Sequence, residues 1–377
     1  MKELLPFIQS YIKNSSAVIN ALKQLEIPDN ALLFTADAIS MYTNIDTKTG
    51  ISAIRDLLDN NHMTIPTTFP TDLFMQILTA VMENNIFSFA NTYWLQLAGT
   101  AMGTPAACNY ATITFGNHEN KEILPNFKRQ LLYYRRYIDD VFGIWIPSTS
   151  PINDAVWDRF KKILNSWGSL KWKIESPSYQ VHFLDLNITL SRSKISTSTY
   201  QKEMNLYLYI PPKSAHPPSC FKGLIHGKLQ RYWNQNNPTD FQNITTNFIQ
   251  RLVERGHTIE DITPLLLQAA FQLNPTTTIK SSQNNSEEDT LYIHWEHHPH
   301  GIQRRDLRQI YNKTLSKVSP FKKMTVALSR PTNLRDLLVR AALNTTHDTY
   351  IQDIINRLRQ PRPLSEINQS DIETSIK

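Results

Sequence analysis

Apolar and polar residues follow two different periods along the chain, and together these predict a mixture of helices and strands. The helical period appears in residues 1–26, 47–61, 71–85, 106–127, 155–167, 239–256 and 259–272. Strands or hairpins are predicted in residues 31–45, 86–105, 131–146, 171–176 and 181–191. Because strands in hairpins are mixed with helices, the pattern predicts an α+β fold rather than a doubly wound parallel sheet.

Changes of pattern divide the chain into four predicted parts. They are an N-terminal helix in residues 1–30, a mixed domain in 31–200, a mainly helical part in 201–345 and a polar tail in 346–377. Residues 274–289 are polar and aperiodic, and are predicted to form a mobile loop. No run of eighteen apolar residues occurs, so no transmembrane helix is predicted. Cys108 and Cys220 are too few for a disulfide framework or a cysteine-based zinc site.

Basic residues are concentrated late in the chain. The net charge of the whole chain is +6, whereas residues 301–340 alone hold ten Lys and Arg against two Asp. Such a patch attracts polyanions, and the nearby Tyr311 and Phe321 offer surfaces for stacking. A solvated helix face is the other interpretation of a basic run, and the sequence leaves both open.

Two adjacent aspartates, Asp139 and Asp140, interrupt the strand-like run RRYIDDVFGIW at residues 135–145. Repulsion and loss of hydration oppose two like charges in such a place unless a cation offsets them. The apolar arms predict that both aspartates stand at a hairpin tip, where their oxygens would suit Mg²⁺. A solvated turn also explains an isolated pair of this kind.

A third acid is expected on another strand, because catalysis with two metal ions needs carboxylates from more than one element. Asp37 follows an apolar run and precedes a turn, which is a poor place for a core residue and a good one for a ligand. Taken alone, Asp37 could instead cap a helix. The segment HWEHHPH at 294–300 could suggest zinc, but it lacks cysteine and HExxH spacing, so an exposed loop is favoured.

Four segments in order resemble the palm motifs of reverse transcriptases. They are FTADAISMYTNI (34–45), QLAGTAMGTPAACNYATITFG (96–116), RRYIDDVFGIW (135–145) and VHFLDLNITL (181–190). AMGTP, RYIDD and SMYTNI are most similar to the Penelope-like retroelement branch, which is related to telomerase. SAHPPSCFKGLIHG, FIQRLVERGH and RPTNLRDLLVRAAL resemble its thumb. The resemblance implies a right-hand polymerase palm of helices and antiparallel sheet in residues 31–200, and a primer grip and mainly helical thumb in 201–345.

The resemblance also implies an RNA-directed DNA polymerase that uses an RNA template, a DNA primer and dNTPs. Asp37, Asp139 and Asp140 would be its catalytic acids and would hold two Mg²⁺ ions, or Mn²⁺ in their place. The implied nucleotide-binding residues are Ser40, Met41, Tyr42, Gln96, Gly103, Thr104 and Pro105. Tyr42 would exclude a ribose 2′-hydroxyl, although packing alone would also explain a tyrosine there.

Other positions of the motifs are implied to have supporting roles. Gly99 and Gly103 would let the backbone approach a ligand closely, and Thr104 and Pro105 would begin the following helix. Asp185 is expected to be structural, bonding a turn or a backbone amide. The implied nucleic-acid-binding residues are Lys202, Ser214, His216, Arg304, Arg305, Arg308, Lys322 and Lys323.

Two features of the resembled family are not found in the sequence. Residues 1–30 would supply at most the end of the fingers subdomain, and no GIY-YIG endonuclease motif follows the thumb. A catalytically inactive nucleic-acid-binding fragment of such an element therefore stays open, and a metal-dependent phosphohydrolase is a third interpretation. The family's work on chromosomal DNA implies a nuclear location, and the oligomeric state is not predicted.

Overall fold

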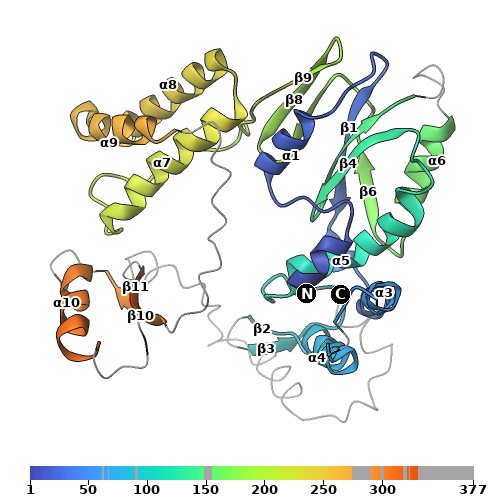
Figure 1. Ribbon diagram of the computed structural model, residues 1–377, viewed down its shortest axis with the longest axis horizontal. Helices are drawn as coiled ribbons and strands as arrows, with labels where there is room; N and C mark the ends of the chain where they lie inside the picture. Colours follow the sequence, from blue (N-terminus) through green and yellow to red (C-terminus); the bar gives the residue numbers. More distant parts are fainter. Residues whose placement is uncertain are drawn as a thin grey trace, which may run out of the picture. The chain divides into compact units, whose positions relative to one another are not determined.

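The structure is a computed structural model that describes residues 1–61, 63–66, 68–89, 92–147, 155–273, 290–297, 301–316, 321 and 323–329 (Figure 1). The chain divides into two compact units, and the larger consists of Met1–Ile86 and Leu95–Pro331. Outside it lie most of β2 (Ile86–Phe89) and β3 (Thr92–Leu95), which pair with each other where a hairpin was predicted. The fold is α+β, as predicted.

A four-stranded antiparallel sheet forms the centre of the larger unit. Its strands are β1 (Leu32–Ile39), β4 (Leu131–Tyr137), β5 (Asp140–Trp145) and β6 (Lys171–Ile174), in the order β4-β5-β1-β6. Successive side chains of a strand point to opposite faces of the sheet. The strands β1, β4 and β5 therefore contribute alternate residues to two separate cores, and β6 contributes to one of them.

Helices cover one face of this sheet. They are α3 (Thr47–Asn60), α4 (Thr71–Glu83), α5 (Ala107–His118) and α6 (Ala155–Leu164), as predicted in outline. The ring of Phe34 on β1 meets Trp145, Trp157 and Phe160 edge-on, at centroid distances of 6.5, 5.1 and 5.3 Å. A Cβ atom at Gly143 would come within 2.3 Å of the Phe34 ring, which explains the glycine in the otherwise bulky run DVFGIW.

A second antiparallel sheet packs in the core on the opposite face. It consists of β7 (Gln180–Phe183), β8 (Leu186–Ser191) and β9 (Lys194–Thr199), and α1 (Ser15–Leu22) shares its core. Leu33 of β1 and Phe142 of β5 belong to this core, and the centroid of Phe142 lies 5.5 Å from that of Phe183. By alternation, Asp37 and Asp140 project from the same face as these residues.

The elements after residue 200 form two groups. The helices α7 (Pro218–Gln235), α8 (Pro238–Glu254) and α9 (Ile259–Phe271) share one apolar core and lie together in Figure 1. In the other group, β10 (Thr290–Glu296) pairs in parallel with β11 (Lys323–Ser329), and α10 (Arg304–Thr314) lies between them in sequence. None of the helices in the described ranges combines the length and the hydropathy that a membrane span requires.

Some predicted elements are wrong in detail. The N-terminal helix is instead a 3₁₀ turn (Lys2–Phe7) that contains Pro6, then an extended segment beside β4, then α1. The single strand expected in 181–191 is two strands, because Leu184 has a φ of 55° and reverses the chain. The sequence pattern shows neither β9 nor α7. The domain boundaries stay predictions, and the predicted loop 274–289 and tail 346–377 lie outside the described residues.

Candidate active site

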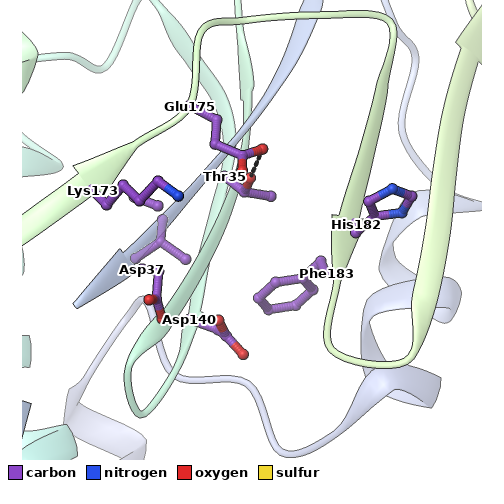
Figure 2. A pocket seen from close by; sticks show the side chains of 9 residues that line it. Thr35, Asp37, Asp140, Lys173, Glu175, His182 and Phe183 are labelled. Atoms are coloured by element: carbon purple, nitrogen blue, oxygen red, sulfur yellow. Dashed lines mark hydrogen bonds between the residues drawn. The ribbon is translucent and has the colours of Figure 1, made fainter. Parts of the chain in front are cut away.

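Two neighbouring strands place Asp37 and Asp140 side by side. In the antiparallel register of β1 with β5, Asp37 lies directly opposite Asp140. Residues paired in this way have Cβ atoms about 4.5–5.5 Å apart and point to the same face of the sheet. Figure 2 shows the two carboxylates together at the edge of a cavity. The structure thus brings together two acids that are far apart in the sequence.

Asp139 lies in the turn that joins β4 to β5. The turn consists of Ile138 and Asp139, and Asp140 is the first residue of β5, so the prediction that both aspartates stand at the tip is wrong for Asp140. The carbonyl of Asp139 accepts a hydrogen bond from the amide of Ala38 (2.9 Å), the residue after Asp37. This bond joins the turn to β1 and keeps Asp139 close to Asp37.

Burial and neighbouring charges raise the pKa values of two of the acids, Asp37 and Asp140. Burial, followed by the charges of Asp139 and Asp37, raises the pKa of Asp140 to about 6. Partial burial and the charge of Asp139 raise the pKa of Asp37, although its side chain reaches solvent. Lys173 opposes the rise in the pKa of Asp37, and Lys202 opposes that of Asp140. The site is therefore a group of mutually repelling carboxylates with two cations at its border.

A cavity of about 210 Å³ opens beside the two paired carboxylates (Figure 2). Its lining includes Thr35, Asp37, Asp140, Lys173, Glu175, His182 and Phe183. Lys173 lies opposite Asp37 in the register of β6 with β1, so Lys173, Asp37 and Asp140 form a row across three neighbouring strands. Lys173 could not be identified from the sequence, because a lysine in a short strand is indistinguishable there from an ordinary exposed residue.

The donor set of the site fits a hard divalent cation. Among the described residues, no three His, Cys, Asp or Glu side chains converge closely enough to form a ready-made metal site. Mg²⁺ does not require such a cage, because it keeps several waters and usually takes one or two carboxylates together with substrate phosphates. Burial, followed by the charges of neighbouring acids, raises the pKa values of Asp37 and Asp140, and a bound cation would offset both effects.

The structure describes part of the segment HWEHHPH at 294–300. His294 and Glu296 lie in β10, so the loop expected at these positions is wrong. His294 and Glu296 are two positions apart in this strand and therefore lie on the same face of it. His297 comes directly after the strand. His298 and His300 lie outside the described residues.

Tyr42 lies on the short helix α2 (Met41–Asn44), which follows β1 directly. Its hydroxyl donates a hydrogen bond to Sγ of Cys108 on α5 (3.4 Å), and burial followed by this contact raises the pKa of Tyr42. The carbonyl of Tyr42 accepts from the amide of Thr100 (2.6 Å). Gly99 has a φ of 75°, and a Cβ atom there would come within 2.9 Å of the Tyr42 carbonyl and the Thr43 backbone. Gly99 therefore lets the Gly-rich segment pack closely against the backbone of Tyr42 and Thr43.

The rest of the Gly-rich segment differs from Gly99. A Cβ atom at Gly103 would meet no atom within 4 Å, so space remains beside it for a ligand. The Thr104 hydroxyl donates to Oδ1 of Asn85 (2.8 Å). Helix α5 begins at Ala107, so Thr104 and Pro105 precede the helix and do not begin it.

Three other predicted nucleotide-binding residues have local partners. Ser40 has a φ of 48°, and its carbonyl accepts hydrogen bonds from the first turn of α2. Met41 packs in the core and the whole residue is only 3% exposed, so it offers a nucleotide little surface to contact. The Gln96 amide donates to the carbonyl of Ala98 (2.9 Å) and so stabilises its own loop.

Asp185 is structural, as expected, although its carboxylate binds side chains and not a backbone amide. It accepts from Nε2 of Gln235 (2.8 Å) and from the hydroxyl of Ser15, and forms an ion pair with Arg231 (3.4 Å). These contacts join the turn between β7 and β8 to α7 and α1.

The predicted nucleic-acid-binding residues are distributed over several elements. Lys202 is exposed and lies close enough to Asp140 to affect its pKa. The Ser214 hydroxyl and Nδ1 of His216 are hydrogen-bonded to each other (2.5 Å) just before α7. Exposed residues of α10 include Arg304, Arg305 and Arg308; Lys323 begins β11; Lys322 lies outside the described residues.

Comparisons with known proteins give a likeness of fold at low identity. No protein-family model matches the sequence, and no curated protein matches it. The chain is similar to telomerase from Candida albicans in complex with a fragment of telomeric RNA (TM-score 0.46, 12% identity, 72% of this chain and 50% of that chain). It is also similar to apo telomerase from Candida tropicalis truncated from its C-terminal domain (0.40, 12%, 52% and 44%) and to the RNA-dependent RNA polymerase of a human picobirnavirus (0.45, 9%, 72% and 51%). The chain spans about half the length of these structures.

Proposed function

We propose that this chain is the polymerase part of a retroelement reverse transcriptase of the Penelope-like branch, which copies an RNA template from a DNA primer with dNTPs. The observation that best supports the activity is the pairing of Asp37 with Asp140 across β1 and β5, with Asp139 in the adjoining turn. Two-metal nucleotidyl transfer needs carboxylates from more than one element at one place. The assignment to the Penelope-like branch is supported by the residues of the sequence motifs and by their order along the chain.

Each residue of the site has a proposed task. Asp37, Asp139 and Asp140 would hold two Mg²⁺ ions, or Mn²⁺ in their place. When bound, these ions would lower the pKa of the primer 3′-hydroxyl and neutralise the charge of the triphosphate and of the departing pyrophosphate. Lys173 and Lys202 would attract phosphate groups to the border of the site.

Selection of dNTPs is proposed to depend on Tyr42. Its ring is held at one end by Cys108, and its backbone is held by Thr100 and Gly99. A ring that cannot move aside would reject a ribose 2′-hydroxyl by steric contact. The open space at Gly103 is the proposed approach for the incoming nucleotide and the template base.

Primer extension by the purified chain tests the proposed activity. The wild type is expected to add dNTPs to a DNA primer annealed to RNA, in the presence of Mg²⁺. Asp139→Asn is expected to lower the rate by a factor on the order of 10⁴, the loss seen when one aspartate of a joint catalytic group is changed to asparagine, with primer–template affinity nearly unchanged. Asp158→Asn, an exposed carboxylate on α6, is the matched control and should extend like the wild type. Equal extension by Asp139→Asn would refute the proposal.

A catalytically inactive nucleic-acid-binding protein is the second candidate. The exposed cations of α10, Arg304, Arg305 and Arg308, favour it because they suit a phosphate backbone without any chemistry. It predicts salt-sensitive binding of RNA and DNA together with no dNTP addition by the wild type. The nuclear location is also a proposal, and localisation of a fluorescent fusion would test it.

A further inference from the structure

A buried arginine lies beside the turn that carries Asp139. Arg136 is on β4, three residues before Asp139, and is 1% exposed. A buried guanidinium loses its hydration, so its N–H groups need acceptors inside the protein. The acceptors that Arg136 uses determine what it holds in place.

The Arg136 guanidinium makes four hydrogen bonds in three directions. Nε and Nη2 donate to the two carboxylate oxygens of Glu119, each at 2.9 Å. Nη2 also donates to the carbonyl of Thr112 in α5 (2.7 Å), and Nη1 donates to the carbonyl of Ile138 (2.7 Å). The guanidinium carbon lies 5.2 Å from the ring centroid of Phe115. A planar group held in this way has one orientation, with one arm directed at the residue before Asp139.

Glu119 anchors the arginine. Its side chain is fully buried, and its carboxylate accepts from Arg136 twice, from the Tyr134 hydroxyl (2.7 Å) and from the Ser10 hydroxyl (2.5 Å). It begins a π-helical turn (Glu119–Ile123) that follows α5 directly, an irregularity that is frequent at functional sites. Donors on both oxygens keep the carboxylate from rotating away from Arg136.

The turn needs an external support of this kind. Ile138 has a φ of 55°, in the left-handed region that β-branched residues avoid. Such a conformation persists when the surroundings fix it, and conformations of this type cluster at functional sites. The Ile138 carbonyl belongs to the peptide bond that leads into Asp139, so the bond from Arg136 acts directly on the orientation of that peptide.

We propose that Arg136, anchored by Glu119, is a positioning residue that locks the Ile138–Asp139 turn to α5 and so sets the place of Asp139 relative to Asp37. This inference rests on the proposed polymerase function. Because α5 also carries Cys108, the partner of Tyr42, the same ion pair relates the catalytic acids to the residue that would select the sugar. Arg136 acts through the turn and touches no substrate.

Single-nucleotide addition by Arg136→Lys tests the positioning role. Lysine keeps the charge but replaces the planar fork with one ammonium group, which cannot hold Glu119, Thr112 and Ile138 together. The kcat of dNTP addition is expected to fall about 100-fold, the effect of a displacement near 1 Å, while the KM for dNTP and the Kd for primer–template stay nearly unchanged. The matched control is Arg135→Lys, the same change on the opposite face of β4, which should keep the wild-type kcat. A wild-type kcat in Arg136→Lys would overturn the inference.

Hydrogen exchange tests the same claim independently of activity. In Arg136→Lys, the amides of residues 137–141 are expected to exchange at least about tenfold faster, because the locked turn opens locally. Amides of α7 and α8 should exchange as in the wild type, and Arg135→Lys should change neither region. Unchanged exchange in 137–141 would overturn the positioning role even if the wild type showed no polymerase activity, a result that would count separately against the proposed function.

A double variant separates positioning from stability. Arg136→Met alone leaves Glu119 buried without its partner and is expected to be strongly destabilised. Adding Glu119→Gln removes the unpaired charge, so the melting temperature should recover towards the wild type. The inference predicts that kcat stays at least tenfold below the wild type in the double variant. Recovery of kcat together with stability would show that the pair serves stability alone.

Discussion

Asp140→Asn should make the metal-free protein more stable at neutral pH, although it alters an acid proposed to be catalytic. The pKa of Asp140 is raised from 3.8 to about 6, chiefly by burial and then by the charges of Asp139 and Asp37. This change in the pKa of Asp140 corresponds to about 3 kcal/mol. Because the carboxyl is partly exposed, solvent screening reduces this to about 1 kcal/mol. For a chain of this length, that is a rise in melting temperature of about 1–2 °C.

Because folding raises the pKa of Asp140, the gain in stability from Asp140→Asn depends on pH. The folded chain binds this proton more tightly than the unfolded chain, so the penalty of ionised Asp140 is complete above pH 6 and disappears as the pH falls towards 4. Thermal unfolding in EDTA should therefore show a gain for Asp140→Asn at pH 7.5 and none at pH 4.

A control variant and added metal sharpen this test. Asp158→Asn should show no gain, because a hydrogen bond from Lys161 lowers the pKa of Asp158. Added Mg²⁺ should stabilise the wild type more than Asp140→Asn. A variant that is less stable than the wild type at pH 7.5, or equally stabilised at both pH values, would refute the account of repulsion.

Three further perturbations test separate parts of the structure. Gly143→Ala should lower the free energy of unfolding by about 1–3 kcal/mol, because the new Cβ would clash with Phe34. Denaturant unfolding measures this loss, and an unchanged stability would contradict the packing of Gly143 against Phe34. Tyr42→Ala should raise ribonucleotide incorporation relative to dNTPs at least about tenfold in primer extension, whereas an unchanged ratio would assign Tyr42 to packing alone. Arg305→Ala with Arg308→Ala should reduce the slope of log K against log salt for RNA–DNA binding by about 2, and an unchanged slope would make α10 a solvated face.

The three acids could be predicted from the sequence because each one stands out from its sequence neighbours. Asp37 follows a buried apolar run, and the Asp139–Asp140 pair interrupts another. The register that pairs Asp37 with Asp140 is not a local property, since it depends on how two distant strands align. For that reason Asp140 was predicted at the hairpin tip, whereas in the structure it begins β5 and lies opposite Asp37.

The supporting residues carry no comparable signal. In the sequence, nothing distinguishes Arg136 from Arg135 beside it. The burial of Arg136 depends on its ion pair with Glu119, which lies on a different element. Lys173 looks like an ordinary strand residue in the sequence. Its position opposite Asp37 results from the pairing of β6 with β1, which is not a local property of the sequence. Helix α7 was hidden by two prolines at its start and by Gly223 and Gly227 within it, which weaken the helical pattern.

The most direct test of the central claim is whether Asp37 and Asp139 act as one unit in catalysis. Rates of single dNTP addition should be measured for Asp37→Asn, Asp139→Asn and the double variant, at equal primer–template occupancy. Each single change is expected to lower the rate nearly to background. The double variant should be no slower than either single variant, because removing one member of a joint catalytic group already disables it. Wild-type addition by Asp37→Asn, or losses that multiply in the double variant, would contradict a shared catalytic site.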